Sequence, residues 1–191
     1  MPLSVFEIIL LIITALAGFS IVWSTIILGI SPMPSSNRAR QAMLQMMDEI
    51  DLEAGTHIKT GPIFELGCGW GGLLIPLAKK YPTREIVGYE LSLIPWFITL
   101  LRAKFLGLKN IRLHRRDFLQ ADISKASVIM CYLFPEGMKV LERKLEQSEF
   151  NADNKNLRYL ISNNFSLSSH NPIKTIQLND LYQSPVYLYK F

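Results

Sequence analysis

The chain has 191 residues and a formal net charge of +4 at neutral pH. Its only two cysteines, Cys68 and Cys131, exclude a small secreted domain built on disulfides and fit a reducing compartment. The basic excess suits an anionic lipid surface or a nucleic acid. Because the basic residues are scattered and do not alternate with aromatic residues, we expect no nucleic-acid partner.

The N-terminal segment, residues 5–30, predicts a transmembrane anchor. No charged residue occurs between positions 8 and 30, and at about 1.5 Å per residue this run makes ~34 Å of helix, enough to cross a hydrocarbon core of ~30 Å. A cleaved signal peptide fits less well, because no Lys or Arg precedes the apolar run. Since Arg38 and Arg40 follow the run, the positive-inside rule predicts a single-pass protein whose remaining chain lies on the cytoplasmic side.

The absence of Arg from the first 37 residues argues against a mitochondrial transit peptide and favours a bacterial inner membrane over a mitochondrial one. Residues 31–60 then predict a Pro/Ser-rich linker followed by an amphipathic helix. Apolar residues recur there at helical spacing, at Ala39, Ala42, Met43, Met46, Met47 and Ile50. Either this face packs on the domain core, or its methionines contact the membrane or a partner.

Residues 61–191 predict one α/β domain. Strands are expected at residues 62–66, 85–90, 111–114, 128–132 and 157–162, and helices at residues 72–80, 91–106 and 135–147. This alternation predicts a mostly parallel sheet with helices on both faces. The last two strands, residues 173–178 and 182–189, are separated only by residues 179–181 and predict a C-terminal antiparallel hairpin.

A glycine-rich turn, FELGCGWGG at residues 64–72, follows the first strand of this domain. Ligands of parallel α/β folds bind where the first strand turns into its helix, and glycine there allows positive φ angles and close approach of the backbone to a ligand. The spacing fits both the dinucleotide pattern G-x-G-x-x-G and the pattern E-x-G-x-G-x-G, in which Glu65 is the acidic residue.

Glu65 favours a cationic ligand. A pyrophosphate beside this carboxylate would be repelled, whereas S-adenosylmethionine carries a sulfonium and an ammonium and no phosphate. We therefore predict that Glu65 holds the methionine ammonium, directly or through water; the alternative is a solvent-facing charge at the start of a helix. The turn residues expected to contact the cofactor are Gly67, Cys68, Gly69 and Gly71.

Two further acidic positions predict a nucleoside site. Glu90, at the end of the second strand, can accept hydrogen bonds from both ribose hydroxyls. Asp117, just past the third strand, can accept the adenine amino group, and Phe118 can cover the ring. The alternative for Asp117 is a cap within the loop.

The motifs ELGCGWGG, GYELS, HRRDF and CYLFPEGM follow one another within residues 62–191. In their order and spacing this part of the chain resembles the class I (seven-β-strand) S-adenosylmethionine-dependent methyltransferases. The resemblance implies a Rossmann-like sheet with a reversed last strand, S-adenosylmethionine as cofactor and methyl transfer as the activity. The apolar N-terminus, GYEL, and P-E-x-M followed by LERKLEQ are similar to the membrane-anchored lysine methyltransferases of the ATP synthase c-subunit and the adenine nucleotide translocase. That similarity implies a membrane enzyme that N-methylates lysine of a membrane-associated protein.

The acceptor site is expected beyond the fourth strand. Many amino-methylating relatives have Asn/Asp-Pro-Pro-aromatic there, whereas this chain has Leu-Phe-Pro-Glu, which speaks against a nucleic-acid base or a glutamine as acceptor. Tyr132 and Phe134 can line an aromatic channel for an ammonium, and Glu136 can attract it. Alternatively, the two aromatic side chains pack in the core, and Glu136 complements the helix dipole.

Two other functions stay open at this point. A methyltransferase for a lipophilic small molecule would need an apolar slot, and an NAD-binding oxidoreductase would need a small residue at position 65 and a Tyr-x-x-x-Lys pair, which the chain lacks. The three histidines, His57, His114 and His170, have no metal-ligand spacing, so we expect no metal.

Overall fold

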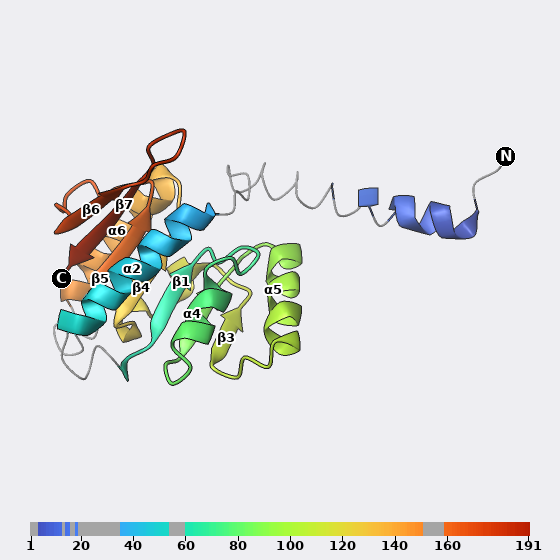
Figure 1. The fold of residues 1–191 in the computed structure, drawn as a ribbon, viewed down its shortest axis with the longest axis horizontal. Helices are drawn as coiled ribbons and strands as arrows, with labels where there is room; N and C mark the ends of the chain where they lie inside the picture. Colours follow the sequence, from blue (N-terminus) through green and yellow to red (C-terminus); the bar gives the residue numbers. More distant parts are fainter. Residues whose placement is uncertain (1–3, 13, 16–17, 19–34, 54–59, 151–158) are drawn as a thin grey trace. The chain divides into compact units, whose positions relative to one another are not determined.

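The structure is a computed structural model that describes residues 4–12, 14–15, 18, 35–53, 60–150 and 159–191 (Figure 1). The chain divides into two units, Met1–Met33 and Pro34–Phe191. Among the described residues, none of the helices has the length and apolar character needed to cross a bilayer. Most of the predicted anchor, residues 5–30, lies outside the described residues, so the anchor stays a prediction.

The second unit contains a seven-stranded sheet in the order β3-β2-β1-β4-β5-β7-β6 (Figure 1). The strands are β1 (Ile63–Leu66), β2 (Ile86–Tyr89), β3 (Ile111–His114), β4 (Val128–Cys131), β5 (Tyr159–Asn163), β6 (Lys174–Gln177) and β7 (Pro185–Lys190). The first five strands are mutually parallel, and β7 is antiparallel to both β5 and β6. The predicted mostly parallel α/β sheet with antiparallel C-terminal strands is therefore confirmed.

The predicted hairpin boundaries differ from the observed ones. The connection between β6 and β7 runs from residue 178 to residue 184, longer than the predicted residues 179–181. The Asp180 carboxylate accepts the Ser184 N–H at 2.8 Å, and Gln183 has a φ of 48°. β7 then begins at Pro185, which has no N–H for the ladder and therefore suits the first position of a strand.

Helices cover both faces of the sheet. They are α2 (Asn37–Glu53), α4 (Leu74–Lys80), α5 (Leu93–Phe105) and α6 (Pro135–Phe150), with short 3-10 turns η1 (Phe118–Gln120) and η2 (Ile123–Lys125). Alternate strand residues point to opposite faces: Ile63 packs in the cluster under α2 and α4, and Phe64 in the cluster under α6. By this alternation Glu65 belongs to the face covered by α2.

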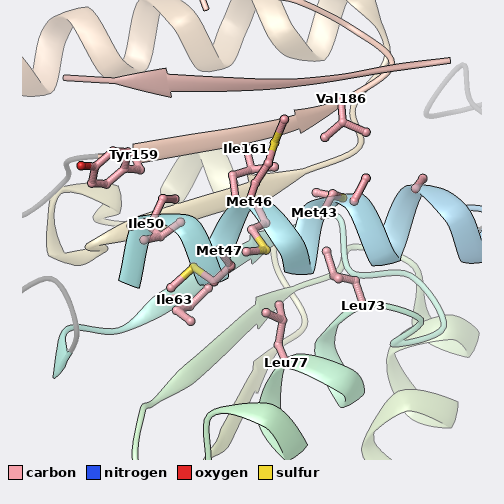
Figure 2. Close-up of a cluster of buried hydrophobic side chains, with 14 of the residues drawn as sticks. Met43, Met46, Met47, Ile50, Ile63, Leu73, Leu77, Tyr159, Ile161 and Val186 are labelled. Carbon is pink, nitrogen blue, oxygen red and sulfur yellow. The ribbon is translucent and has the colours of Figure 1, made fainter. Parts of the chain in front are cut away.

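The amphipathic helix α2 packs on the domain core. Met43, Met46 and Met47 have no exposed surface, and they contact strand and α4 residues (Figure 2). The alternative, in which these methionines contact the membrane or a partner, is wrong. An unbranched thioether fills the irregular space between the helix and the twisted sheet, which explains a methionine-rich buried face.

The direction of α2 positions the site. Near its C-terminus, Glu49 pairs with Lys174 at 2.6 Å and Asp51 with Arg84 at 3.1 Å, where β6 and β2 begin. Its N-terminal end instead lies where β1 and β5 end: Arg40 donates to the Gly72 carbonyl, and Ser35, just before the helix, lies 3.5 Å from Asn163. The edge of the sheet at which the parallel strands end is called here the carboxyl edge.

Candidate active site

The glycine turn after β1 adopts the backbone conformation that its sequence predicts. Gly67, Gly69 and Gly71 have φ angles of 73°, 51° and 72°, which residues other than glycine rarely adopt. The backbone N–H groups of Gly67 and Cys68 both donate to the Tyr89 carbonyl, at 2.9 and 3.0 Å. Hydrogen bonds to the end of β2 therefore fix the start of the turn.

Two of these glycines have different surroundings. A Cβ built on Gly69 would meet no heavy atom within 4 Å, whereas one on Gly71 would lie 2.7 Å from Thr99 Cγ2. The hydroxyl of Thr99 donates to the Gly69 carbonyl at 2.9 Å. Gly71 thus permits the packing of the turn on α5, and Gly69 borders open space at the carboxyl edge, as a ligand-contacting residue requires.

Glu65 is a buried carboxylate with an unpartnered oxygen. Its side chain is 7% exposed, and Oε2 has no hydrogen-bond partner in the described part of the chain. Burial raises its pKa well above the usual range, with repulsion by Glu90 adding to this effect and Arg40 opposing it. The alternative of a solvent-facing charge at a helix start is wrong, because Glu65 lies inside β1.

The unpartnered oxygen of Glu65 fits a cationic group. A buried carboxylate is costly unless it is protonated or paired, and an ammonium beside it would satisfy Oε2 and favour the ionised form. The residues present at this turn therefore fit the ammonium of S-adenosylmethionine and do not fit a phosphate.

Glu90 braces the turn from the end of β2. Its Oε2 accepts the Gly69 N–H at 2.9 Å, and its Oε1 accepts the Ser92 N–H at 2.7 Å. Each carboxylate oxygen has a second lone pair, so both can still accept a ribose hydroxyl. Sequence analysis did not predict the bracing contact, because it depends on the packing of β2 beside the turn.

Asp117 and Phe118 lie just past the end of β3. One oxygen of Asp117 accepts the Leu119 N–H at 2.9 Å and caps η1, as the alternative interpretation proposed. The cap uses Oδ1, and the second carboxylate oxygen is the one that could reach an adenine amino group. The side chain of Phe118 is partly buried and packs against the cluster under α6. The adenine-binding roles of both residues stay predictions.

The three predicted acceptor residues differ in their exposure to solvent. Tyr132 is half-buried and stacks on Phe165 with ring centroids 6.3 Å apart and planes 15° apart, and Phe134 is also half-buried. Glu136, in contrast, is exposed in the first turn of α6 and pairs with Lys139 at 2.6 Å. This position agrees with the alternative interpretation, in which Glu136 complements the helix dipole.

Asn163 and Phe165 are site candidates that sequence analysis missed. Asn163 ends β5 and is 4% exposed; its Nδ2 lies 3.5 Å from Ser35 Oγ, and its Oδ1 has no hydrogen-bond partner among the described residues. β5 is the neighbour of β4, with Cys131 beside Ser162 in register, so the end of β5 lies beside Tyr132. The available signal was the segment NNF, residues 163–165, directly after the predicted strand 157–162; its polar asparagines are typical of a loop.

Within the described ranges, no group of three or more His, Cys, Asp or Glu side chains could hold a metal ion. Cys68 is buried in the turn, and burial raises the pKa of its thiol well above the usual range, with Glu65 and Glu90 adding to the effect. It contributes its backbone to the turn, and its side chain is a neutral thiol.

The strand order, the antiparallel β7, the glycine turn after β1 and the carboxylate after β2 together define a class I S-adenosylmethionine-dependent methyltransferase. The family described as the ANTKMT methyltransferase domain matches residues 65–174, more than half of the chain, and the chain belongs to this family. S-adenosylmethionine is therefore the cofactor of this domain, and the NAD-binding oxidoreductase alternative is wrong.

Individual relatives agree with this assignment. The chain is 34% identical over 136 residues to an uncharacterized protein of Rickettsia prowazekii, covering 67% of this chain and 24% of that protein, so it spans about a quarter of that relative's length. It is 27% identical over 129 residues to a protein-lysine N-methyltransferase of Saccharolobus islandicus, covering 66% of this chain and 77% of that protein.

Solved structures share the fold. An RNA methyltransferase from Salinibacter ruber, in complex with S-adenosyl-L-homocysteine, superposes with a TM-score of 0.64 at 24% identity, covering 83% of this chain and 93% of that one. The magnesium protoporphyrin IX methyltransferase of Synechocystis, with bound cofactor, has a TM-score of 0.58 at 15% identity, covering 83% and 86%.

Proposed function

We propose that the protein is a membrane-anchored methyltransferase that transfers methyl groups from S-adenosylmethionine to a lysine of a membrane-associated protein. The observation that carries the proposal is the buried carboxylate of Glu65, whose Oε2 has no partner within the described residues, beside a turn of glycines with positive φ. The family and the lysine-specific name of the Saccharolobus relative support the choice of acceptor.

The chain's main task in this reaction is positioning. When bound, the cofactor supplies a methyl group on a sulfonium, which an amine displaces in line. Because the positive charge on sulfur disperses as the reaction proceeds, the protein needs chiefly to align the three reacting atoms. Glu65 and Glu90 would fix the two ends of the cofactor that do not react, and the backbone at Gly69 would approach it closely.

The acceptor amine must be neutral to react. A free lysine has a pKa of about 10.4 and is mostly protonated at neutral pH, but desolvation lowers this pKa. The stacked pair Tyr132 and Phe165 would provide an apolar wall for the lysine side chain. The Asn163 Oδ1 atom could accept one N–H of the amine and orient its lone pair.

An anchor would increase the chance of encounter with a membrane substrate. Residues 8–30 contain no charge. Arg38 and Arg40, eight and ten positions after Ile30, place positive charge on that side of the span, as in proteins whose main domain is cytoplasmic. Enzyme and substrate would then share a two-dimensional space, which raises their effective concentration.

The test uses the full chain in lipid vesicles together with membrane fractions from its source organism. Transfer of a labelled methyl group, followed by acid hydrolysis, should yield methylated lysine from protein, and the Glu65→Gln variant should lose most of this activity. Label that extracts with the lipids instead would support a lipophilic small-molecule acceptor and refute the lysine assignment. Calorimetric titration should detect binding of S-adenosylmethionine and none of NAD; lack of binding would refute the proposed site.

A further inference from the structure

The carboxyl edge carries exposed apolar side chains on three separate connections. They are Leu91 between β2 and α5 and Leu93 at the first position of α5, Leu119 after β3, and Leu181 and Tyr182 between β6 and β7, with exposed fractions of 47, 53, 38, 89 and 83%. Because β3 and β6 are the outermost strands of the sheet, these side chains flank the glycine turn of the central strand β1 on both sides.

Exposed arginines accompany the apolar side chains. Arg115 and Arg116 follow β3, and Arg38 lies at the start of α2. An acidic residue of the same edge, the half-buried Asp180, has a lowered pKa mainly because it accepts the Ser184 N–H, and the positive charge of Arg38 contributes to the lowering. Large apolar side chains with arginines beside them are typical of surfaces that enter an anionic lipid interface.

The same edge is where the chain from the predicted anchor enters the domain. Ser35 lies 3.5 Å from Asn163 at the end of β5. Five Cα–Cα steps join Ile30, the end of the predicted anchor, to Ser35, and at no more than ~3.6 Å per step they span at most about 18 Å. An anchored chain could not hold its carboxyl edge far from the membrane surface.

We propose that the carboxyl edge docks on the bilayer itself, with the connection between β6 and β7 inserting Leu181 and Tyr182 among anionic lipid headgroups. This inference rests on the anchor in the proposed function and adds an orientation to it: the methyl-transfer site faces the membrane. The acceptor lysine would then lie at the lipid surface.

A fluorescent lipid-quenching experiment on the full chain tests this orientation. The Leu181→Cys variant is labelled with an environment-sensitive fluorophore and reconstituted in vesicles of phosphatidylcholine and phosphatidylglycerol that contain brominated lipid. The matched control is Phe105→Cys, which is 88% exposed at the end of α5, on the opposite edge of the sheet. The native thiols should label little, since Cys68 and Cys131 are 4% and 1% exposed.

We expect label at position 181 to shift to shorter emission wavelength and to lose about half of its intensity or more, while label at position 105 stays aqueous and unquenched. Equal behaviour of the two labels in vesicle-bound protein would overturn the proposed orientation and leave the anchor and the activity intact. Shielding of position 181 from aqueous iodide without quenching by lipid would overturn it in favour of a protein partner. Failure of the chain to float with the vesicles would refute the anchor and, with it, this inference. The methyl-transfer activity is measured in a separate assay, so its presence or absence does not depend on this outcome.

Discussion

Replacing Gly69 with alanine should weaken cofactor binding without unfolding the domain. Gly69 has a φ of 51° and open space where its Cβ would lie. Gly107, just past α5, offers a matched control with a φ of 65° and equally open space, far from the glycine turn. The two alanine variants share the same backbone strain and differ only in what the new methyl group faces.

The expected magnitudes follow from this geometry. A non-glycine residue in the left-handed region costs about 1–2 kcal/mol, so both variants should lose this much unfolding free energy. A methyl group that intrudes where the cofactor approaches the backbone should cost a further ~1–3 kcal/mol of binding, or about 5- to 150-fold in affinity. Gly71→Ala should instead destabilise the fold most, because its Cβ would lie 2.7 Å from Thr99 Cγ2.

Urea denaturation measures the stability of each variant, and calorimetry measures its affinity for S-adenosylmethionine. We expect Gly107→Ala to bind the cofactor as the wild type does and Gly69→Ala to bind it weakly. Wild-type affinity in Gly69→Ala, at equal stability of the two variants, would refute the placement of the cofactor against this turn.

Other side chains give sharp outcomes in the same assays. Without cofactor, the native state retains a proton on Glu65 that the unfolded chain releases above the ordinary pKa of 4.5, so the free energy of unfolding should fall as the pH rises above that value. Urea titrations at several pH values measure this dependence, and the Glu65→Gln variant should lack the component that comes from Glu65. Met46→Ala should lower the free energy of unfolding by about 2–5 kcal/mol, because Met46 is fully buried. Leu52→Ala, at an 83% exposed position, should change it by less than about 0.5 kcal/mol. Equal effects of the two variants would contradict the packing of α2. Asn163→Ala should raise the KM for the lysine acceptor about tenfold or more and leave the cofactor affinity unchanged, whereas an unchanged KM would exclude Asn163 from the acceptor site.

The order of strands and helices could be predicted from the sequence because it depends on neighbouring residues. Short apolar runs such as Val128–Cys131 are buried on both faces, which is the pattern of a central parallel strand. The predicted third strand, residues 111–114, coincides with β3, and the other boundaries differ by a few residues. The need for positive φ at Gly67, Gly69 and Gly71 was equally local, since glycine is the residue that adopts it at low cost.

The position of β7 between β5 and β6 was not predictable from pattern alone. A hairpin pattern fixes that two strands pair, but it does not determine which of them joins the sheet, because that depends on backbone pairing with a strand distant in sequence. The role of the methionines in α2 was also ambiguous, since a buried helix face and a membrane-contacting face have the same periodicity.

The sequence by itself therefore determined the class of fold, the turn and the two carboxylates that would hold the cofactor, because each is specified by residues within a short segment. Only the tertiary structure decided that Glu65 is buried with an unpartnered oxygen, that Glu90 braces Gly69, and that Asn163 lies beside Ser35, 128 positions earlier in the chain. These contacts join residues from different elements at the carboxyl edge. Their formation depends on sheet register and on the packing of α2, and neither leaves a periodic signal in the sequence.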